Sequence, residues 1–397
     1  MWSRGLRWKY SYMLLLITWM GWVSIYLVKS VLPPVLPVLS LELGLSHAQA
    51  GLLETAYLIG YIVVKMPAGS LSDKYGPKKV LAASMLGYGA ASAATVLARG
   101  FNDIFMLRLL VGLFQGVHLP VANALLSDRF GVRQGRAIGF NESGPNVGNT
   151  LAFPLTVSIM SAWSWRAAFL ILSIPAFALS MVTLLLMKEE PKVLSEQVVR
   201  GNSIWEYWRL LLPFAVAHGV YNLVLRAAFT FTPLFLVEYR GMDVASAGLF
   251  ATALPLAGIL AKVSSGFIAE KAGSRLSICG ATAFSALFLA SLVALPSGSY
   301  VAINLVALGL TVYSFSPIIY ASTTASLPSG LKATGLGAVT MLGNMVGVVS
   351  TSIVGALIDS YGYGFAFSSI AVVTLAATYI IYMTLKSEVK ATTQFLS

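Results

Sequence analysis

Basic residues placed inside long apolar stretches are the side chains of this 397-residue chain with the clearest chemical potential. Lys29 and Arg226 each lie well within such a stretch. A charge at the centre of a membrane helix costs about 2.5–3.5 kcal/mol, which a cavity, a partner acid or a bound anion offsets. We predict that the two residues face a cavity and bind a carboxylate or phosphate. Arg226 would act as a bidentate fork and Lys29 as a mobile point charge.

Lys65 and Lys262 occupy a second pair of apolar runs. Each precedes a loop acid by eight residues. At 1.5 Å per residue this places each lysine about 12 Å inward along a helix. Three roles stay open for them: contact with a substrate, part of a cytoplasmic gate, or extension of the ammonium group to the membrane surface.

Few acids accompany these cations, and they are the candidates for proton coupling. Glu54 and Glu142 lie in apolar runs, and so does His118. Burial raises a carboxyl pKa and a nearby lysine lowers it, so each acid either titrates or serves as a fixed counter-ion. His118 has an intrinsic pKa suited to a proton switch, and the alternative is a hydrogen bond between helices.

Hydroxyl, amide and imidazole groups near these charges would orient a bound organic acid. With the four cations, the predicted substrate site contains Tyr26, Tyr61, Gln115, His118, Tyr313 and Asn344. Each such residue alone is more often a packing or interfacial residue. The chain has no HExxH, Walker loop or paired intramembrane aspartates. We therefore expect no enzyme, no metal and no cofactor.

The elements that must position these residues are membrane helices. Hydrophobic residues make up 57% of the chain and charged residues 10%, whereas a soluble domain is about 25% charged. The mean hydropathy is +0.80. The net charge of +11 is spread over short loops and forms no basic face, so we expect no nucleic-acid partner and a lipid bilayer as the surroundings.

Glycine, proline and charged residues divide the chain into twelve helical runs, so we predict an all-α membrane protein. The predicted spans are 10–38, 46–71, 78–98, 101–125, 135–160, 166–187, 208–237, 244–269, 275–295, 299–323, 330–357 and 363–385. They form two six-helix halves, residues 1–187 and 208–397, joined by a polar linker at 188–207. An open sheet is excluded because lipid cannot satisfy its backbone.

Two stretches, Ser46 to Lys79 and Asp243 to Leu276, repeat each other 197 residues apart, and 11 of their 34 aligned positions are identical. The same offset pairs Lys29 with Arg226 and Lys65 with Lys262. A chain built from two related membrane halves places its substrate site between them.

Loop charges predict the orientation. Of the loop lysines and arginines, 18 fall on one side and 3 on the other. The positive-inside rule then places both termini in the cytoplasm. We expect a monomer in the plasma membrane.

The loop at the end of each repeat contains glycines, one acidic residue and basic residues. We predict that the two loops act as a gate that closes the transporter on its cytoplasmic side. The acid would cap a helix or pair with a loop arginine, and a purely topogenic basic loop is the alternative. Arg108 is expected to bond neighbouring helix ends. The gating set is Gly69, Asp73, Lys74, Gly76, Lys78, Arg108, Arg133, Arg136, Glu270, Lys271, Gly273 and Arg275.

The first of these loops, GSLSDKYGPKK at 69–79, resembles the signature loop of the major facilitator superfamily. Arg108-x3-Gly112-x3-Gly116 supports the resemblance. Gly139-x4-Gly144-Pro145-x2-Gly148 is similar to the glycine–proline motif of many antiporters of that family.

A narrower resemblance, to the anion:cation symporter branch, rests on RLLVGLFQGVHLP, GRAIGFNESG and SWRAAF. That branch includes sugar-acid transporters and relatives of sialin and the vesicular glutamate transporters. This chain has Val28 and Lys29 where the branch often has Asp-Arg, and Gln115 where it commonly has Glu. The resemblance therefore implies anion binding, while two acids that it would assign to proton coupling are absent.

Together these features predict a secondary active transporter of a small organic anion, a carboxylate or sugar acid, working by alternating access. Proton symport and anion exchange both stay open. Proton-coupled drug efflux is the alternative, motivated by the glycine–proline motif. The four cations together with Arg108 outnumber the two acids in the apolar runs, which disfavours this alternative because they would repel a cationic drug.

Overall fold

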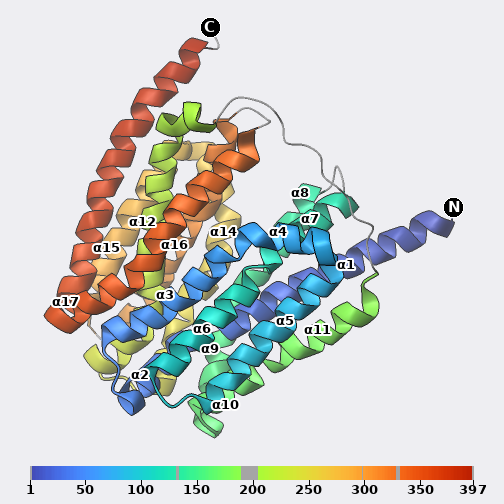
Figure 1. The fold of residues 1–397 in the computed structure, drawn as a ribbon. Helices are drawn as coiled ribbons and strands as arrows, with labels where there is room; N and C mark the ends of the chain where they lie inside the picture. The colour runs from blue at the N-terminus through green and yellow to red at the C-terminus, as the bar shows by residue number, and fades with distance from the viewer. Residues whose placement is uncertain (1, 131–133, 189–203, 297, 328–330, 396–397) are drawn as a thin grey trace. The chain divides into compact units, whose positions relative to one another are not determined.

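The structure is a computed structural model that describes residues 2–130, 134–188, 204–296, 298–327 and 331–395 (Figure 1). It divides into two compact units. Unit 1 comprises residues 1–45 and 52–196, and unit 2 comprises residues 46–51 and 197–397. Most of the predicted linker, residues 189–203, lies outside the described residues, and the short 3-10 helix η3 (Ile204–Tyr207) follows it.

All regular elements of the described residues are helices. The helices that precede the linker are α1 (Trp2–Lys29), α2 (Leu32–Leu43), α3 (His47–Val63), α4 (Lys65–Tyr75), α5 (Pro77–Ala94), η1 (Thr95–Leu97), α6 (Phe101–Gln115), α7 (His118–Phe130), α8 (Gln134–Asn141), α9 (Gly144–Ala162), α10 (Trp165–Ile171) and α11 (Ile174–Leu186). Those that follow it are α12 (Trp208–Leu234), the π-helix η4 (Phe235–Tyr239), α13 (Val244–Ala251), α14 (Ala253–Ala272), α15 (Ser274–Ala294), α16 (Ser299–Ala325) and α17 (Lys332–Phe395).

Short breaks separate many of these helices, and joining across them leaves twelve runs within the described residues. The longest helix, α17, is itself two helices joined at Gly362, whose φ of 78° is not helical. By length and composition, nine stretches of the described residues are long and apolar enough to cross a membrane. One of the nine, Gly335–Leu385, spans the break at Gly362 and so holds two runs; the α3–α4 and α8–α9 runs are outside the nine. The predicted all-α fold of twelve membrane helices is confirmed.

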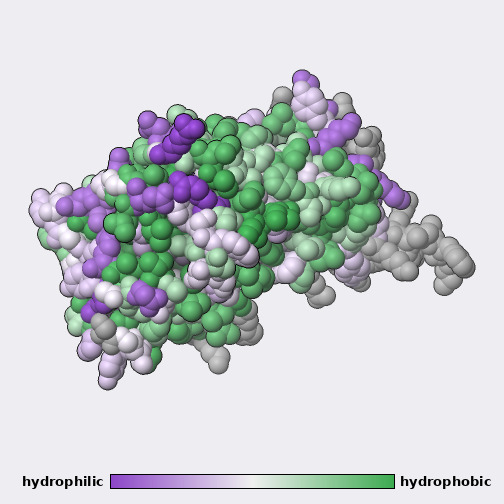
Figure 2. All heavy atoms as spheres, turned by 90° about the horizontal axis from the view of Figure 1, so that it is seen from below, coloured by the Kyte–Doolittle hydropathy of each residue, from purple (hydrophilic) through white to green (hydrophobic). Residues whose placement is uncertain are grey.

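The outer surface suits a lipid environment. Figure 2 shows one face on which apolar residues form broad areas, with hydrophilic residues in smaller patches. Large apolar side chains such as Leu185, Ile303 and Val372 are exposed. Lipid tails can cover such residues at no cost in hydration.

The sequence repeat reappears in the backbone. Gly44 and Gly241, 197 residues apart, have φ of 62° and 66°. Gly76 and Gly273, at the same offset, have φ of 85° and 78°. A side chain strongly disfavours this left-handed region, so glycine is required at the same turns of both repeats.

Helix packing repeats as well. A Cβ atom at Gly112 of α6 would collide with the carbonyl oxygen of Tyr57 on α3. At an offset of 197 residues, a Cβ at Gly309 of α16 would collide with the carbonyl oxygen of Leu254 on α14. Both glycines therefore let two helix backbones touch, and each contact lies within its own unit.

Candidate functional site

A column of tyrosine rings and lysine ammonium groups runs along α1, α3 and α4 in unit 1. Lys29 Nζ lies 4.9 Å from the ring centre of Tyr26 and 5.3 Å from that of Tyr57. Tyr57 and Tyr61 stack with their centres 5.8 Å apart, and Lys65 Nζ lies 4.5 Å from the ring centre of Tyr61. We call these five residues the tyrosine–lysine column. The faces of the rings stabilise the two cations in a poorly hydrated place.

Helical spacing places the column. Tyr57, Tyr61 and Lys65 are four residues apart, so they follow one face of α3 into α4 across the break at Val64. Tyr26 and Lys29 share the last turn of α1. Tyr57 is buried, and the other four are half-buried. The structure thus brings together four residues that were predicted from the sequence to contact a substrate.

A buried ion pair lies beside the column. Arg108 Nη2 donates to Glu54 Oε2 at 2.9 Å, and Arg108 Nη1 donates to the carbonyl oxygen of Lys29 at 3.3 Å. The guanidinium also lies 4.9 Å from the ring centre of Tyr57. Arg108 is 2% exposed and Glu54 5%. Arg108 therefore fixes the end of α1, and Glu54 has an arginine as its counter-ion.

Three other predicted residues of unit 1 lie at helix breaks. Gln115 and His118 flank the break between α6 and α7, and both are 0% exposed. Gln115 Nε2 donates to the carbonyl oxygen of Ile25 at 3.1 Å, and His118 Nε2 lies 3.0 Å from that of Thr18. Both side chains thus contact the backbone of α1. Glu142 lies in the turn between α8 and α9 and is half-buried.

In unit 2, Arg226 belongs to a polar stripe on α12. His218, Asn222 and Arg226 are four residues apart. Asn222 Nδ2 donates to the carbonyl oxygen of His218 at 3.0 Å, and His218 Nε2 lies 3.3 Å from Tyr320 Oη. A Cβ atom at Gly347 of α17 would lie 2.7 Å from Arg226 Nε. Glycine at this position of α17 leaves room for the guanidinium.

The other predicted residues of unit 2 are dispersed. Tyr313 is 4% exposed, and its ring packs directly against Gly258, where a Cβ atom would lie 2.6 Å from it. Asn344 and Lys262 are half-buried on α17 and α14. We describe the column of unit 1 and the stripe of unit 2 separately.

Part of the predicted gate lies outside the described residues. This applies to Arg133 and to the side chains of Asp73, Arg136, Glu270 and Lys271. In the rest of the gate, Gly76 and Gly273 form the turns noted above, and Gly69 and Lys74 are exposed. Lys78 is half-buried at the start of α5, and the Arg275 guanidinium lies 3.6 Å from the ring centre of Tyr382.

Sequence reasoning missed a polar cluster at the start of α3. His47 contacts Glu238 of η4 and Asp359 of α17, and Tyr363 completes the cluster. These partners are 191 and 312 residues away from His47, so no local pattern points to them. A histidine beside the serine that begins the second predicted helix was the only available signal.

The helical fold is that of a polytopic membrane protein, and comparison with known proteins identifies the family. Residues 18–351, and again 214–395, match the Major Facilitator Superfamily. The chain belongs to that superfamily.

Individual relatives agree with the anion-transporting branch. The chain is 25% identical over 371 residues to the hexuronate transporter of Bacillus subtilis, covering 88% of both chains. It is 27% identical over 259 residues to the probable sulfoacetate transporter SauU of Cupriavidus necator, covering 60% of both. A bacterial homologue of the human lysosomal transporter Spinster has the same fold, with a TM-score of 0.83, 15% identity, and coverage of 94% of this chain and 96% of that one.

Proposed function

We propose that this chain carries a small organic anion, a carboxylate or sugar acid, across the plasma membrane by alternating access. The named substrates of the two sequence relatives support this cargo. A hexuronate carries a carboxylate, and sulfoacetate carries a carboxylate and a sulfonate. Negative charge is the property that the two share.

The tyrosine–lysine column is the observation that carries the proposal. Lys29 and Lys65 lie on its half-buried face, and the buried Arg108 contacts the ring of Tyr57. Arg108 also holds Glu54 in an ion pair. Attraction between charges is strong where water is scarce, so three basic side chains along one group of rings favour an anion and repel a cationic drug.

The glycine–proline motif, which favours the efflux alternative, has a packing explanation. A Cβ atom at Gly144 would lie 2.7 Å from the Cβ of Trp22, and one at Gly148 would lie 2.6 Å from the carbonyl oxygen of Val23. These glycines therefore let α9 approach α1 closely, which many membrane proteins need whatever they transport.

We assign the following roles. Lys29 and Arg226 neutralise the anion, Tyr26 and Tyr61 orient its hydroxyl groups, and Lys65 and Lys262 either contact it or gate its path. Gln115 and His118 act by holding α1 in place. The glycine-acid loops close the transporter on its cytoplasmic side, and both chain termini lie in the cytoplasm. The unit of transport is the monomer.

Two coupling modes remain in the proposal, proton symport and anion exchange. Exchange agrees with Val28 and Gln115 at positions where the resemblance expects acids, and with Glu54 bound to Arg108. Symport would require Glu142, Glu54 or His118 to bind and release a proton.

Uptake of labelled glucuronate by proteoliposomes tests the proposal. Lys29→Gln should abolish uptake, and Lys29→Arg should retain part of it because the charge is kept. Lys188→Gln, which changes an exposed lysine over the ring of Tyr10, is the matched control and should transport normally. Normal uptake by Lys29→Gln would remove the column from the substrate site.

A further inference from the structure

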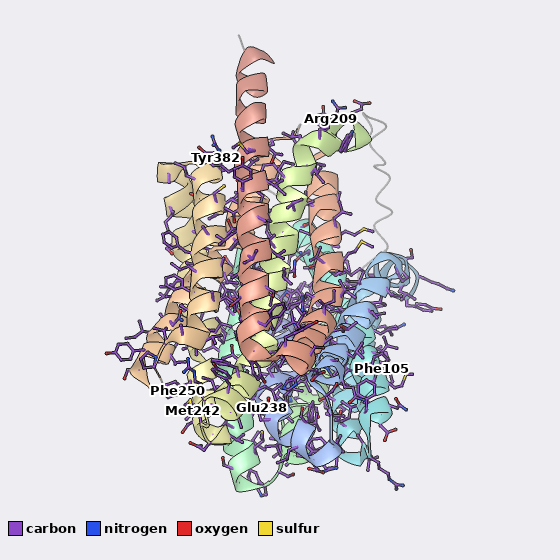
Figure 3. The ribbon with its side chains drawn as sticks, turned by 90° about the vertical axis from the view of Figure 1, so that its left-hand side faces the viewer. Phe105, Arg209, Glu238, Met242, Phe250 and Tyr382 are labelled. Atoms are coloured by element: carbon purple, nitrogen blue, oxygen red, sulfur yellow. The ribbon has the colours of Figure 1, made fainter. Side chains whose placement is uncertain are left out.

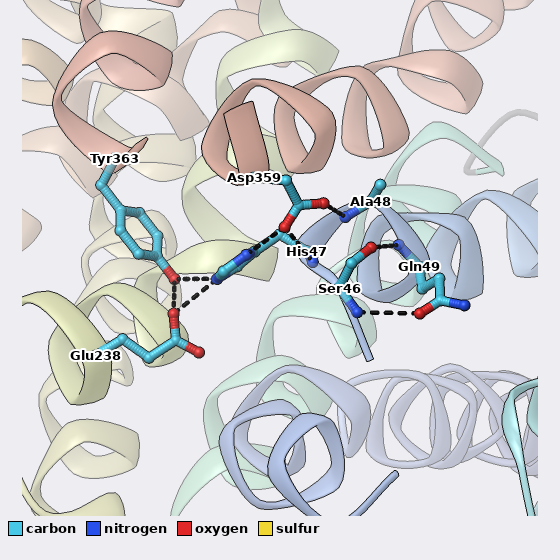
Figure 4. Close-up of polar contacts among 7 residues, drawn as sticks. All are labelled: Ser46, His47, Ala48, Gln49, Glu238, Asp359 and Tyr363. Atoms are coloured by element: carbon cyan, nitrogen blue, oxygen red, sulfur yellow. Dashed lines mark hydrogen bonds and ion pairs between the residues drawn. The ribbon is translucent and has the colours of Figure 1, made fainter. Parts of the chain in front are cut away.

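His47, the first residue of α3, lies between two carboxylates (Figure 4). Its Nε2 is 2.7 Å from Glu238 Oε2, and its Nδ1 is 2.7 Å from Asp359 Oδ1. A neutral imidazole has only one N–H, so one of these contacts would set a lone pair against a carboxylate oxygen. The protonated ring donates to both acids at once, and Tyr363 Oη lies 3.1 Å from the same Nε2 and donates to Glu238. The two carboxylates therefore favour the imidazolium.

The same acids hold the backbone at the start of α3. The Asp359 carboxylate accepts hydrogen bonds from the backbone N–H groups of His47 and Ala48, both at 2.8 Å. A Cβ atom at Gly355 would collide with the carbonyl oxygen of His47, and one at Gly51 would collide with that of Thr351. The first turn of α3 is thus packed directly on α17.

This turn has a special place in the chain. Residues 46–51 belong to unit 2, whereas the rest of α3, from Leu52 onward, belongs to unit 1. Whatever holds or releases the first turn therefore acts on a helix that both units share.

The cluster lies at one end of unit 2. Figure 3 shows Glu238 at the opposite end of this unit from Arg209 and Tyr382. His47 follows the first membrane run, so it lies on the side opposite the amino terminus. With the orientation proposed above, this side faces the outside of the cell.

Unit 1 contains a comparable contact that does not titrate. Glu42, near the end of α2, accepts from Trp165 Nε1 at 2.6 Å and from Arg166 Nη1 at 2.7 Å. Both donors keep their protons at any physiological pH. In unit 2, Glu238 accepts instead from Tyr363 Oη at 2.7 Å and from the titratable ring of His47.

We propose that His47 is a proton-operated latch that holds the first turn of α3 on α17 while it is protonated and releases the turn when it loses its proton. Low pH on the outer side then favours the state in which the first turn of α3 is packed on α17. This regulation by the pH outside the cell would operate with any substrate, so the proposal does not depend on the identity of the anion.

The charges around His47 set the direction of the pH effect. Hydrogen bonding to Glu238 raises the pKa of His47, partial burial opposes the rise, and bonding to Asp359 adds to it. The latch is therefore fully formed below the ordinary histidine pKa and is lost as pH rises through the raised value.

Tyr363 faces the cluster from α17 and donates to Glu238. Arg240, two residues after Glu238, donates instead to the carbonyl oxygens of Leu292 and Val293.

Cysteine labelling of purified protein in nanodiscs tests the latch without any substrate. In a Cys279→Ser background, Ala50→Cys places a thiol on the docked turn, where Ala50 is 0% exposed. We expect its labelling by a polar maleimide to rise severalfold from about pH 5 to about pH 9, a range that spans the ordinary histidine pKa. Leu41→Cys, at a residue 87% exposed, gives the intrinsic pH dependence by which each rate is divided.

Variants of the cluster then decide whether His47 is the cause. His47→Gln should give fast labelling at every pH, and Glu238→Gln should move the labelling midpoint to lower pH. Arg166→Gln, which breaks the unit 1 contact, should leave the pH profile unchanged. If His47→Gln does not fold, the midpoint of Glu238→Gln alone decides the matter. A parent that labels equally at all pH values, or cluster variants with the parent's profile, would overturn the proposal.

Discussion

The two units carry the same scaffold but distribute charge differently. In unit 1, Arg108 and Glu54 form a buried ion pair beside the tyrosine–lysine column. The positions 197 residues later hold Leu305 and Ala251, which are 0% and 2% exposed. The glycine contacts of α6 with α3 and of α16 with α14 are the same in both. A buried ion pair is therefore not needed for this packing, and we propose that the pair in unit 1 serves the substrate site.

The two units also differ in which of two packed helices has a glycine and which has a tyrosine. In unit 1, Gly116 packs on the carbonyl oxygen of Tyr61. In unit 2 the same two positions hold Tyr313 and Gly258, and the ring of Tyr313 fills the space above Gly258. Glycine and tyrosine have exchanged places. The exchange leaves the half-buried ring of Tyr61 to the column in unit 1 and buries the ring of Tyr313 in unit 2.

Breaking the ion pair should have the largest effect. Arg108→Leu removes the guanidinium that pairs with the buried Glu54, so we expect a loss of about 3–5 kcal/mol in the free energy of unfolding. Adding Glu54→Ala copies unit 2 and should recover most of that stability. Transport should fail in both variants. Thermal unfolding and uptake measure the two effects, and a double variant no more stable than the single one would contradict the comparison.

Arg226→Ala should abolish transport without unfolding the protein. Its removal takes the charge from the α12 stripe, while Gly347 and Asn222 keep the packing with α17. Arg209→Ala is the control, because Arg209 is exposed at the start of the same helix. Uptake assays on folded protein check the result. Normal uptake by Arg226→Ala would contradict the proposed anion site.

Replacing Gly258 or Gly116 by alanine should be destabilising, and a second substitution at the facing tyrosine should rescue only the Gly258 variant. At Gly258 a Cβ would lie 2.6 Å from the ring of Tyr313, so Gly258→Ala should cost about 1–3 kcal/mol of unfolding free energy, partly restored by Tyr313→Ala. At Gly116 the obstacle includes a backbone carbonyl, so Tyr61→Ala should not rescue Gly116→Ala. Double-mutant cycles of thermal stability measure both couplings. Equal couplings in the two units would refute the difference.

Helix caps give the smallest predicted effect. Asp243 caps α13 by accepting from the N–H of Ser246. Hydrogen bonds from the side chain and then the backbone of Ser246 lower the pKa of Asp243. The contribution of the cap is present above the ordinary aspartate pKa and is lost as pH falls through the lowered value. Asp243→Ala should therefore reduce Tm slightly at neutral pH and less in acid. Ser164→Ala, at the neutral cap of α10, should lower Tm equally at both pH values.

The sequence alone predicted the helices and the repeat well, because both depend on local pattern. Apolar runs of membrane length mark the helices, and Gly44, Gly76, Gly241 and Gly273 mark turns that only glycine accepts easily. The column was predicted in part, since spacing on α3 and α4 aligns Tyr61 with Lys65.

Contacts between residues that are far apart in the chain could not be predicted from the sequence. The ion pair of Glu54 with Arg108 joins residues that lie 54 positions apart. The contacts of Gln115 and His118 with α1, and those of His47 with Glu238 and Asp359, depend on how helices cross. A single sequence contains no record of those crossings.

Uptake by proteoliposomes of a labelled panel of carboxylates, sugar acids and phosphate esters tests the central claim most directly. Each compound is offered with an inward proton gradient, and again with only unlabelled anion inside. The account predicts uptake of at least one organic anion, driven by the gradient if symport holds, or dependent on internal anion if exchange holds. It also predicts loss of that uptake in Lys29→Gln. Uptake of cationic drugs with no anion transported would contradict it.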